Sequence, residues 1–101
     1  MSILHIISTS PTMRSSLQSC LRVAQKGNAI IFIEDAVMAV KKECVDELIN
    51  NALGRIKLYV LKPDLKARGI KSDQLIEGIV SVDYHEFVRL TVKYDRVQTW
   101  S

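Results

Sequence analysis

Two cysteines offer the most direct route to covalent chemistry in this chain of 101 residues. A cysteine acts as a nucleophile, or accepts sulfur, as the thiolate, which nearby positive charge or a helix N-terminus favours. Cys20 falls in the middle of a segment with helical spacing, so its nearest neighbours stand three and four positions away. None of these neighbours is charged: they are Ser16, Leu17, Val23 and Ala24. The local chemistry therefore predicts that Cys20 is a small buried apolar residue.

Cys44 has surroundings that favour the thiolate more strongly. It follows Lys41 and Lys42 and stands near the expected start of a helix, and both features lower the pKa of a thiol. On local grounds Cys44 is the more reactive of the two cysteines. The alternative interpretation is a solvated thiol without a role.

Glu34 and Asp35 form the best carboxylate pair of the sequence, directly after the apolar run 29–33. Adjacent residues at the end of a strand point in opposite directions, so these two carboxylates do not share one site. We expect one of them to cap the following segment and the other to be solvated.

The patterns of several common sites are missing from the sequence. The turn expected at residues 8–12 contains no glycine, which argues against the usual phosphate-binding loop. His5 and His85 stand far apart, and neither pairs with a cysteine at metal-ligand spacing. We expect His5 to be a strand residue with a satisfied hydrogen bond. No serine has the flanking glycines of a hydrolase nucleophile, so the sequence predicts no cofactor and no metal.

The element expected to position these residues is the run 29–33, Ala-Ile-Ile-Phe-Ile. A strand with one solvated face alternates apolar and polar residues, whereas this run is apolar throughout and too short for a buried helix. Both of its faces should therefore be covered, as in a central strand of a parallel sheet with helices on both sides. In such sheets the functional groups gather at the carboxyl ends of the strands, which here carry Glu34 and Asp35.

The rest of the chain supplies further strands and helices around this run. Four more strands are expected at residues 3–7, 56–61, 79–82 and 97–100, with 56–61 less completely buried because of Lys57 and Tyr59. Four helical segments are expected between them: 11–26, opened by Ser10 and Pro11; 45–53; a short one at 62–69; and 83–94. The run 36–40 fits either a short helix or a loop, and 70–78 reads as a loop or broken helix. This alternation predicts an α/β protein built as a three-layer α/β/α sandwich.

The expected helices have apolar faces that should pack against this sheet. In the helix at 83–94, Asp83 and Glu86 have the spacing of a capping box. The predicted inner faces consist of Met13, Leu17, Cys20, Leu21 and Ala24 in the first helix, Val45, Leu48, Ile49 and Ala52 in the second, and Phe87, Val88, Thr91 and Tyr94 in the last.

Length and composition set the general class of the protein. We expect residues 1–101 to form a single domain. The net charge of +3 is dispersed over the chain, so direct nucleic-acid binding is not expected. The longest apolar run is far short of the roughly 20 residues that span a bilayer, and the first residues lack the pattern of a signal peptide. We therefore expect a cytoplasmic protein with reduced thiols and no membrane contact.

Several stretches together resemble the TusB/DsrH family of sulfur-relay proteins, and in combination they cover nearly the whole chain in the same order. They are a first strand with His5 followed by Ser10-Pro11, then residues 32–35, 58–69, 82–91 and 97–100. None of them is a catalytic signature by itself.

The resemblance implies a fold, partners and a site. The fold would be the small DsrE-like α/β/α sandwich around a five-stranded, mostly parallel sheet. The chain would be a subunit of a heterohexamer with TusC/TusD-like or DsrE/DsrF-like subunits, served by a TusA-type or DsrC-type sulfur carrier. The complex would pass persulfide sulfur toward wobble-uridine 2-thiolation in tRNA, or between carriers during sulfur oxidation. Cys20 stands where the DsrH branch has a cysteine in its first helix, which makes Cys20 the candidate catalytic residue and favours the Dsr branch.

Three functions remain open at this point. The first is an accessory subunit of a sulfurtransferase complex, in which Cys20 matters only after assembly. The second is a stand-alone thiol sulfurtransferase that acts through Cys20 or Cys44. The third is a regulatory binding domain without sulfur chemistry, because a fold does not fix a function.

Overall fold

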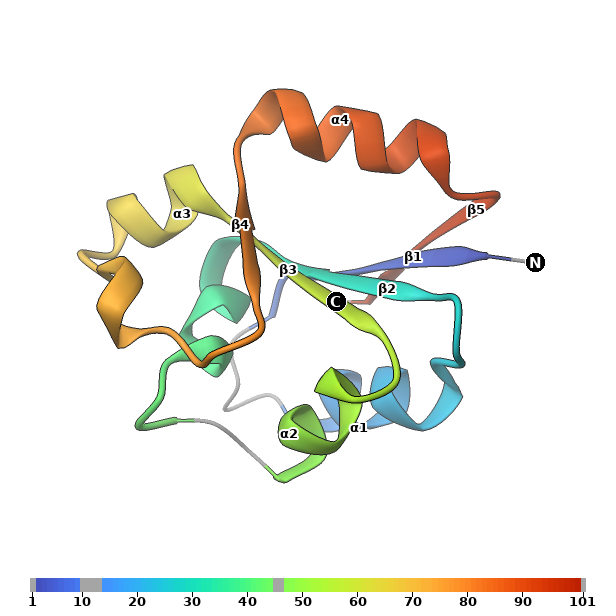
Figure 1. Ribbon diagram of the computed structural model, residues 1–101, viewed down its shortest axis with the longest axis horizontal. Helices are drawn as coiled ribbons and strands as arrows, with labels where there is room; N and C mark the ends of the chain where they lie inside the picture. Colours follow the sequence, from blue (N-terminus) through green and yellow to red (C-terminus); the bar gives the residue numbers. More distant parts are fainter. Residues whose placement is uncertain (1, 10–13, 45–46, 101) are drawn as a thin grey trace.

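A five-stranded sheet forms the centre of the protein in the computed structural model, which describes residues 2–9, 14–44 and 47–100 (Figure 1). The strands in their order across the sheet are β4 (Val80–Val82), β3 (Lys57–Leu61), β2 (Ala29–Phe32), β1 (Ile3–Ile7) and β5 (Arg96–Trp100). All four pairings are parallel. The predicted α/β class is confirmed, and the apolar run at 29–32 is the middle strand.

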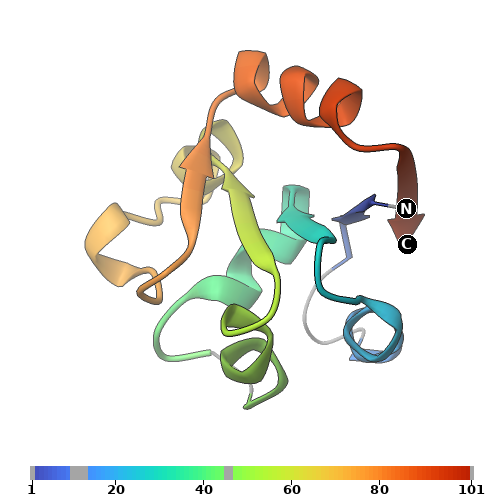
Figure 2. The same ribbon diagram turned by 45° about the vertical axis from the view of Figure 1, so that its right-hand side comes forward.

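Helices lie on both faces of this sheet (Figures 1 and 2). One face packs against α1 (Arg14–Val23), α2 (Glu47–Leu53) and the 3-10 helix η1 (Glu34–Val40). The other face packs against α4 (Tyr84–Lys93). The short helix α3 (Lys62–Ala67) and the 3-10 turn η2 (Ser72–Gln74) connect β3 to β4. The predicted three-layer arrangement is thus confirmed, and the ambiguous run 36–40 belongs to η1.

Strand β2 is buried on both faces, as its continuous apolar sequence predicts. Ile30 and Phe32 point into the core on the side of α1 and α2, and Ala29 and Ile31 point into the core on the side of α4. All four side chains are fully buried. Tyr59 in the neighbouring strand β3 is also buried, so the expectation of a partly exposed third strand is wrong at this residue. Its ring packs in the core below α4. A tyrosine can be buried in this way because its aromatic ring is large and apolar, although it carries a hydroxyl group.

Helix α4 begins at the predicted capping box. The Asp83 carboxylate accepts a hydrogen bond from the backbone N–H of Glu86 at 2.8 Å, and the Glu86 carboxylate accepts one from the N–H of Asp83 at 3.2 Å. The predicted inner face is partly wrong, because Val88 is 60% exposed whereas Leu90 is buried. Leu90 packs with Phe87 and Tyr94 against the sheet. These three residues share one side of a helix, while Val88 lies about 100° away from Phe87 around the axis.

The remaining differences from the sequence prediction concern segments on the other face. In α2, Ile49 and Ala52 are buried as predicted, but Leu48 is 37% exposed. The segment 70–78 is more ordered than a plain loop, because its Ile76 N–H donates to the carbonyl of Val40 and side chains of this segment enter the core. The predicted cap of the first helix at Ser10 and Pro11, its first inward residue Met13, and Val45 of the second helix lie outside the described residues.

Candidate functional site

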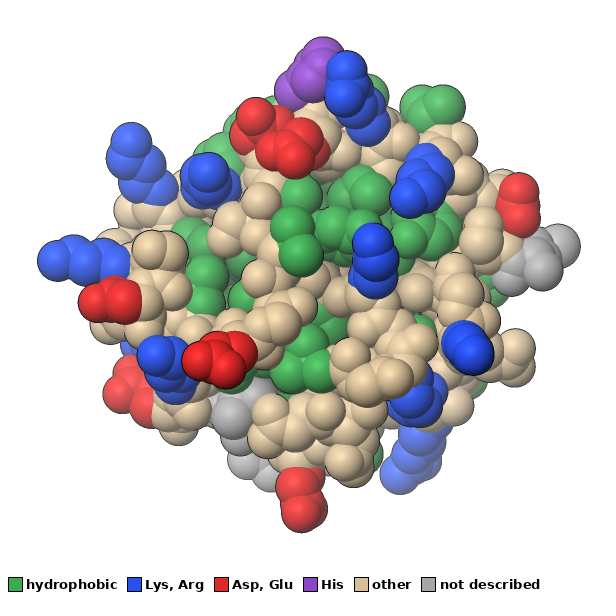
Figure 3. All heavy atoms as spheres, in the orientation of Figure 1, with side chains coloured by type: hydrophobic (Ala, Val, Ile, Leu, Met, Phe, Trp, Pro, Cys, Tyr) green, Lys and Arg blue, Asp and Glu red, His purple; other side chains and the backbone are tan. Residues whose placement is uncertain are grey.

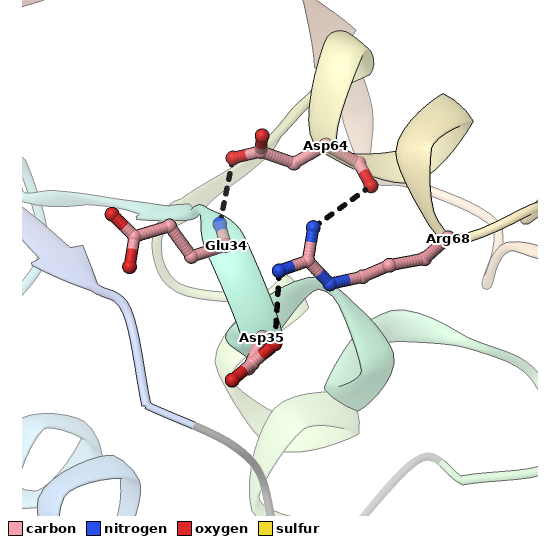
Figure 4. A network of polar contacts seen from close by, with 4 residues as sticks. All are labelled: Glu34, Asp35, Asp64 and Arg68. Atoms are coloured by element: carbon pink, nitrogen blue, oxygen red, sulfur yellow. Dashed lines mark hydrogen bonds and ion pairs between the residues drawn. The ribbon is translucent and has the colours of Figure 1, made fainter.

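A network of polar contacts occupies the carboxyl ends of β2 and β3 (Figure 4). Glu34 follows β2 and has a φ angle of 51°, which is uncommon for a residue other than glycine and turns the chain sharply into η1. Its backbone N–H donates a 2.7 Å hydrogen bond to the carboxylate of Asp64 in the first turn of α3. The carboxylate of Asp64 therefore holds the turn after β2 against the helix that follows β3.

Arg68 completes this network from the end of α3. Its guanidinium forms a 2.8 Å ion pair with the carboxylate of Asp35 and donates a 3.3 Å hydrogen bond to the carbonyl oxygen of Asp64. The side chain of Asp35 is 69% exposed and that of Arg68 is 28% exposed. Solvent screens such a pair, which limits its contribution to stability.

The arrangement corrects the role expected for the carboxylate pair. No side chain caps η1, whose cap residue is Ile33, so neither Glu34 nor Asp35 acts as a helix cap. The two carboxylates do not share a site, as predicted, and Asp35 binds Arg68. No local sequence pattern indicates that partner, 33 positions away, although the carboxyl ends of adjacent parallel strands meet at one sheet edge. Within the described ranges, no three acidic, histidine or cysteine side chains are grouped so that they could hold a metal ion.

A second polar network joins the beginning of the chain to its end. Trp100 donates a hydrogen bond from its indole Nε1–H to Nδ1 of His5, at 3.1 Å. Because an indole nitrogen only donates, Nδ1 of His5 must accept, and the ring proton must lie on Nε2. Nε2 then donates to the Oδ1 oxygen of Asn28, at 3.0 Å. His5 is buried, so the prediction of a strand histidine with satisfied hydrogen bonds is confirmed.

A shallow groove lies beside this second network, along β1 and β5. Its volume is about 310 Å³, and His5, Trp100 and Gln98 supply polar groups to its wall, which Val23 of α1 also lines. The groove contains no cysteine. It therefore does not connect the buried histidine to either thiol.

Cys20 lies in α1 and is fully buried in the core between that helix and the sheet. Burial raises the pKa of its thiol to about 12, because the low-polarity surroundings disfavour the charged form. At neutral pH the residue is therefore a protonated thiol without access to a sulfur donor. The open helix face that a relay role of Cys20 requires is not present in the isolated chain, and the relay role itself stays a prediction.

Cys44 is an exposed free thiol in the turn before α2. One of the two lysines expected to favour its thiolate has another partner, because Lys41 forms a 2.8 Å ion pair with Glu43. The hydrogen bond that Lys41 donates to the Glu43 carboxylate raises the pKa of Lys41. A carboxylate thus partly compensates the positive charge of Lys41, which weakens the contribution of this lysine to a reactive Cys44.

Comparison with known proteins identifies the family. The family model described as DsrH like protein matches residues 9–97. The chain belongs to the DsrH-like family. Proteins named TusB share 34% identity over 99 residues in Pectobacterium parmentieri, 36% over 98 in Escherichia coli, and 37% over 98 in Salmonella newport. These alignments cover 94–96% of this chain and 99–100% of the relatives.

Solved structures place the DsrH-like chain in a wider fold group. The ychN protein from E. coli superposes with a TM-score of 0.81 at 21% identity, over 99% of this chain and 100% of that one. MTH1491 from Methanobacterium thermoautotrophicum, a protein of unknown function, superposes with a TM-score of 0.73 at 17% identity, over 96% of both chains. At these identities the likeness concerns the fold alone. The resemblance inferred from the sequence is confirmed at the level of family and fold.

The stretches that carry this family resemblance contact one another in the folded chain. Residues 32–35 contact residues 58–69 through Asp64 and Arg68. His5 of the first strand contacts Trp100 of the closing stretch. In the DsrH-like chain these residues therefore connect neighbouring strands of the sheet.

Proposed function

We propose that this chain is an accessory subunit of a sulfur-relay complex, which passes persulfide sulfur between carrier proteins toward the 2-thiolation of wobble uridine in tRNA. The observation that carries the proposal is the match along nearly the whole chain to relatives named TusB. In this proposal the chain assembles with TusC- and TusD-type subunits into a heterohexamer that a TusA-type carrier serves. The same relatives favour the tRNA branch. The cysteine in the first helix had instead favoured the sulfur-oxidation branch.

Two structural features support an accessory role. Sulfur transfer requires an accessible thiolate that attacks the outer sulfur of the donor persulfide, so that a new S–S bond forms and the donor leaves as a thiolate. Cys20 has no access to such a donor and keeps its proton at neutral pH. The contacts of Arg68 with Asp35 and of His5 with Trp100 connect neighbouring strands of the sheet and involve no cysteine. These features fit a subunit that contributes a binding surface to the complex and no reactive group.

Co-expression tests this function directly. The chain should form one assembly near six chains with TusC- and TusD-type subunits from the same organism, as measured by size-exclusion chromatography with light scattering. Alone, it should be poorly soluble or self-associated. A stable monomer that ignores both partner subunits would contradict the proposal.

A second candidate is a stand-alone sulfurtransferase that uses Cys44, which the exposure of that thiol favours. Mass spectrometry after treatment with a persulfide donor separates the two functions. A stable added sulfur atom on Cys44 of the isolated chain, lost in Cys44→Ser, would favour the second function. We expect no such mass on either cysteine of the isolated chain.

The relay role of Cys20 is tested within the assembly. The Cys20→Ser variant should be compared with Cys44→Ser for assembly and for sulfur flux from the TusA-type carrier. Normal assembly with lost flux in Cys20→Ser alone would establish a relay role that depends on a rearrangement of α1. Normal assembly with normal flux would show that Cys20 is only a core residue.

A further inference from the structure

Helix α4 carries apolar side chains on the side that faces away from the sheet. Tyr84, Val88 and Val92 follow one another at intervals of four residues, so they form a single row along the helix. Their exposed fractions are 58%, 60% and 80%. The inward side of the same helix already has its own apolar residues, Phe87 and Leu90 among them. We call the outward residues 84, 88 and 92 the outer row.

The sheet below α4 is covered incompletely. A helix is about 10 Å wide, whereas five strands at about 4.8 Å spacing are about twice as broad. On this face α4 is the only helix of the described chain that packs across the sheet (Figure 2). Apolar side chains of the strands on both sides of it remain exposed. Val80 in β4 is 48% exposed and Val97 in β5 is 44% exposed. The outer row and these strand residues together leave much apolar surface in water.

A basic row runs beside the outer row on α4. His85, Arg89 and Lys93 are exposed and also follow at intervals of four residues, one position after each member of the outer row. Beyond them lies a groove of about 240 Å³ between the helix and β3 and β4, with Tyr59 and Leu90 in its wall. Figure 3 shows the molecule with α4 at the top, where hydrophobic groups gather below the helix and both basic and acidic side chains border them.

We propose that the outer row of α4 is the docking surface for a different protein chain, which presents an apolar ridge bordered by carboxylates. The inference rests on the proposed function, because the partner would be a subunit of the same complex. The apolar row would bury against the ridge, and the basic row would face the carboxylates. Such a border of complementary charge selects the partner and its orientation.

The charge pattern argues against a second copy of this chain as the occupant. A two-fold interface brings the same patch of both chains together. When two copies of α4 pair antiparallel through the outer row, the basic row of one meets the basic row of the other, and like charges oppose that pairing. A partner with acidic residues at the same places removes the repulsion.

Nucleic acid is also a poorer fit for this surface. Arg89 and Lys93 are the two strong bases of the row, and Asp83 and Glu86 stand at the start of the same helix. A phosphate backbone is recognised by clustered positive charge, and two bases beside two acids supply little of it. The apolar outer row would also remain in water in such a complex.

The experiment compares variants of the outer row in the assembled complex. Val88→Asp and Val92→Asp should each weaken binding to the co-expressed TusC- and TusD-type subunits by at least tenfold, and Arg89→Glu by a smaller factor. Val23→Asp is the matched control, because Val23 is 53% exposed on α1, on the opposite face. The control should bind like the wild type. Circular dichroism of each variant checks that the fold is kept.

Hydrogen exchange supplies a measurement that needs no variant. Amides of residues 84–93 should exchange more slowly in the wild-type complex than in the isolated chain. Assembly without this protection, or with full binding of Val88→Asp, would overturn the docking surface and leave the proposed function intact. Failure of the wild type to assemble would overturn both. Self-association that Val92→Asp abolishes would assign the outer row to a second copy, and tRNA binding that Arg89→Glu abolishes would assign the surface to nucleic acid.

Discussion

The two faces of the sheet differ in how completely they are closed. On the face of α1 and α2, side chains from both helices, from η1 and from the segment after α3 join one core with Ile30 and Phe32. On the face of α4, a smaller core lies under a single helix, and Val80 and Val97 remain partly exposed beside it. The closed face keeps Cys20 from solvent, whereas the open face offers apolar surface to another molecule. The cysteine of the first helix therefore lies on the closed face, where it cannot react. The surface suited to contact with another protein lies on the opposite face.

The largest expected difference between the faces concerns stability. Phe32→Ala should lower the free energy of unfolding by about 4 kcal/mol, because it leaves a cavity in the closed core. Leu90→Ala should cost about 2 kcal/mol, since water reaches the open face and the site can partly collapse. Urea denaturation followed by circular dichroism measures both values. Equal costs would show that the two faces are closed to the same degree.

The next effect concerns the thiol of the closed face. Cys20→Ser should destabilise the fold by about 2 kcal/mol, because it buries a hydroxyl group among apolar side chains. Cys44→Ser is the matched control and should change stability by less than about 0.5 kcal/mol, as exposed substitutions usually do. In the native wild type, iodoacetamide should modify Cys44 and spare Cys20 until the chain unfolds. Rapid modification of Cys20 would show that its helix face opens.

A third effect tests the edge of the closed face at β5. Trp100→Phe removes the indole N–H and leaves Nδ1 of His5 without its donor. The expected cost is about 1–2 kcal/mol, since a buried acceptor loses its hydrogen bond. The urea midpoint should fall, and the amides of β5 should exchange faster with solvent. An unchanged midpoint would show that this network contributes little to the docking of the last strand.

Alkaline pH should reveal the buried thiol in a smaller effect. The pKa of Cys20 is about 12 in the folded chain against an ordinary value of 9.0. The unfolded thiol therefore ionises first, and stability falls as the pH rises above about 9. At pH 10 the loss from this group should be on the order of 1 kcal/mol. Cys20→Ala should lose that part of the pH dependence, and an identical slope in both proteins would contradict the assignment.

The smallest effect belongs to the open face of the isolated chain. Val92→Asp should change the free energy of unfolding by less than about 0.5 kcal/mol, because Val92 is 80% exposed. Urea denaturation of the isolated chain measures it. A cost above about 1 kcal/mol would show that this side chain is buried in the monomer. The two faces of the sheet would then differ less in closure than described above.

Local patterns in the sequence specified most of the elements. The apolar run 29–33 predicted a strand covered on both faces, of which residues 29–32 form β2, and Asp83 with Glu86 predicted the start of α4. The first prediction rests on the burial that a continuous apolar run requires. The second rests on hydrogen bonds between residues three positions apart. The uncharged neighbours of Cys20 likewise indicated a buried thiol, which the structure confirms. No element of the described chain is long and apolar enough to serve as a membrane-spanning helix.

The tertiary structure alone decided which of these elements meet and which sides face the core. It chose Leu90 over Val88 as the inward residue, because the direction in which α4 crosses the sheet selects which of the helix's apolar residues face the core. It also paired Arg68 with Asp35 and Trp100 with His5, which stand 33 and 95 positions apart. Such pairs follow from the strand order β4-β3-β2-β1-β5. A local sequence pattern cannot encode that order, because it depends on how the whole chain closes around its two cores.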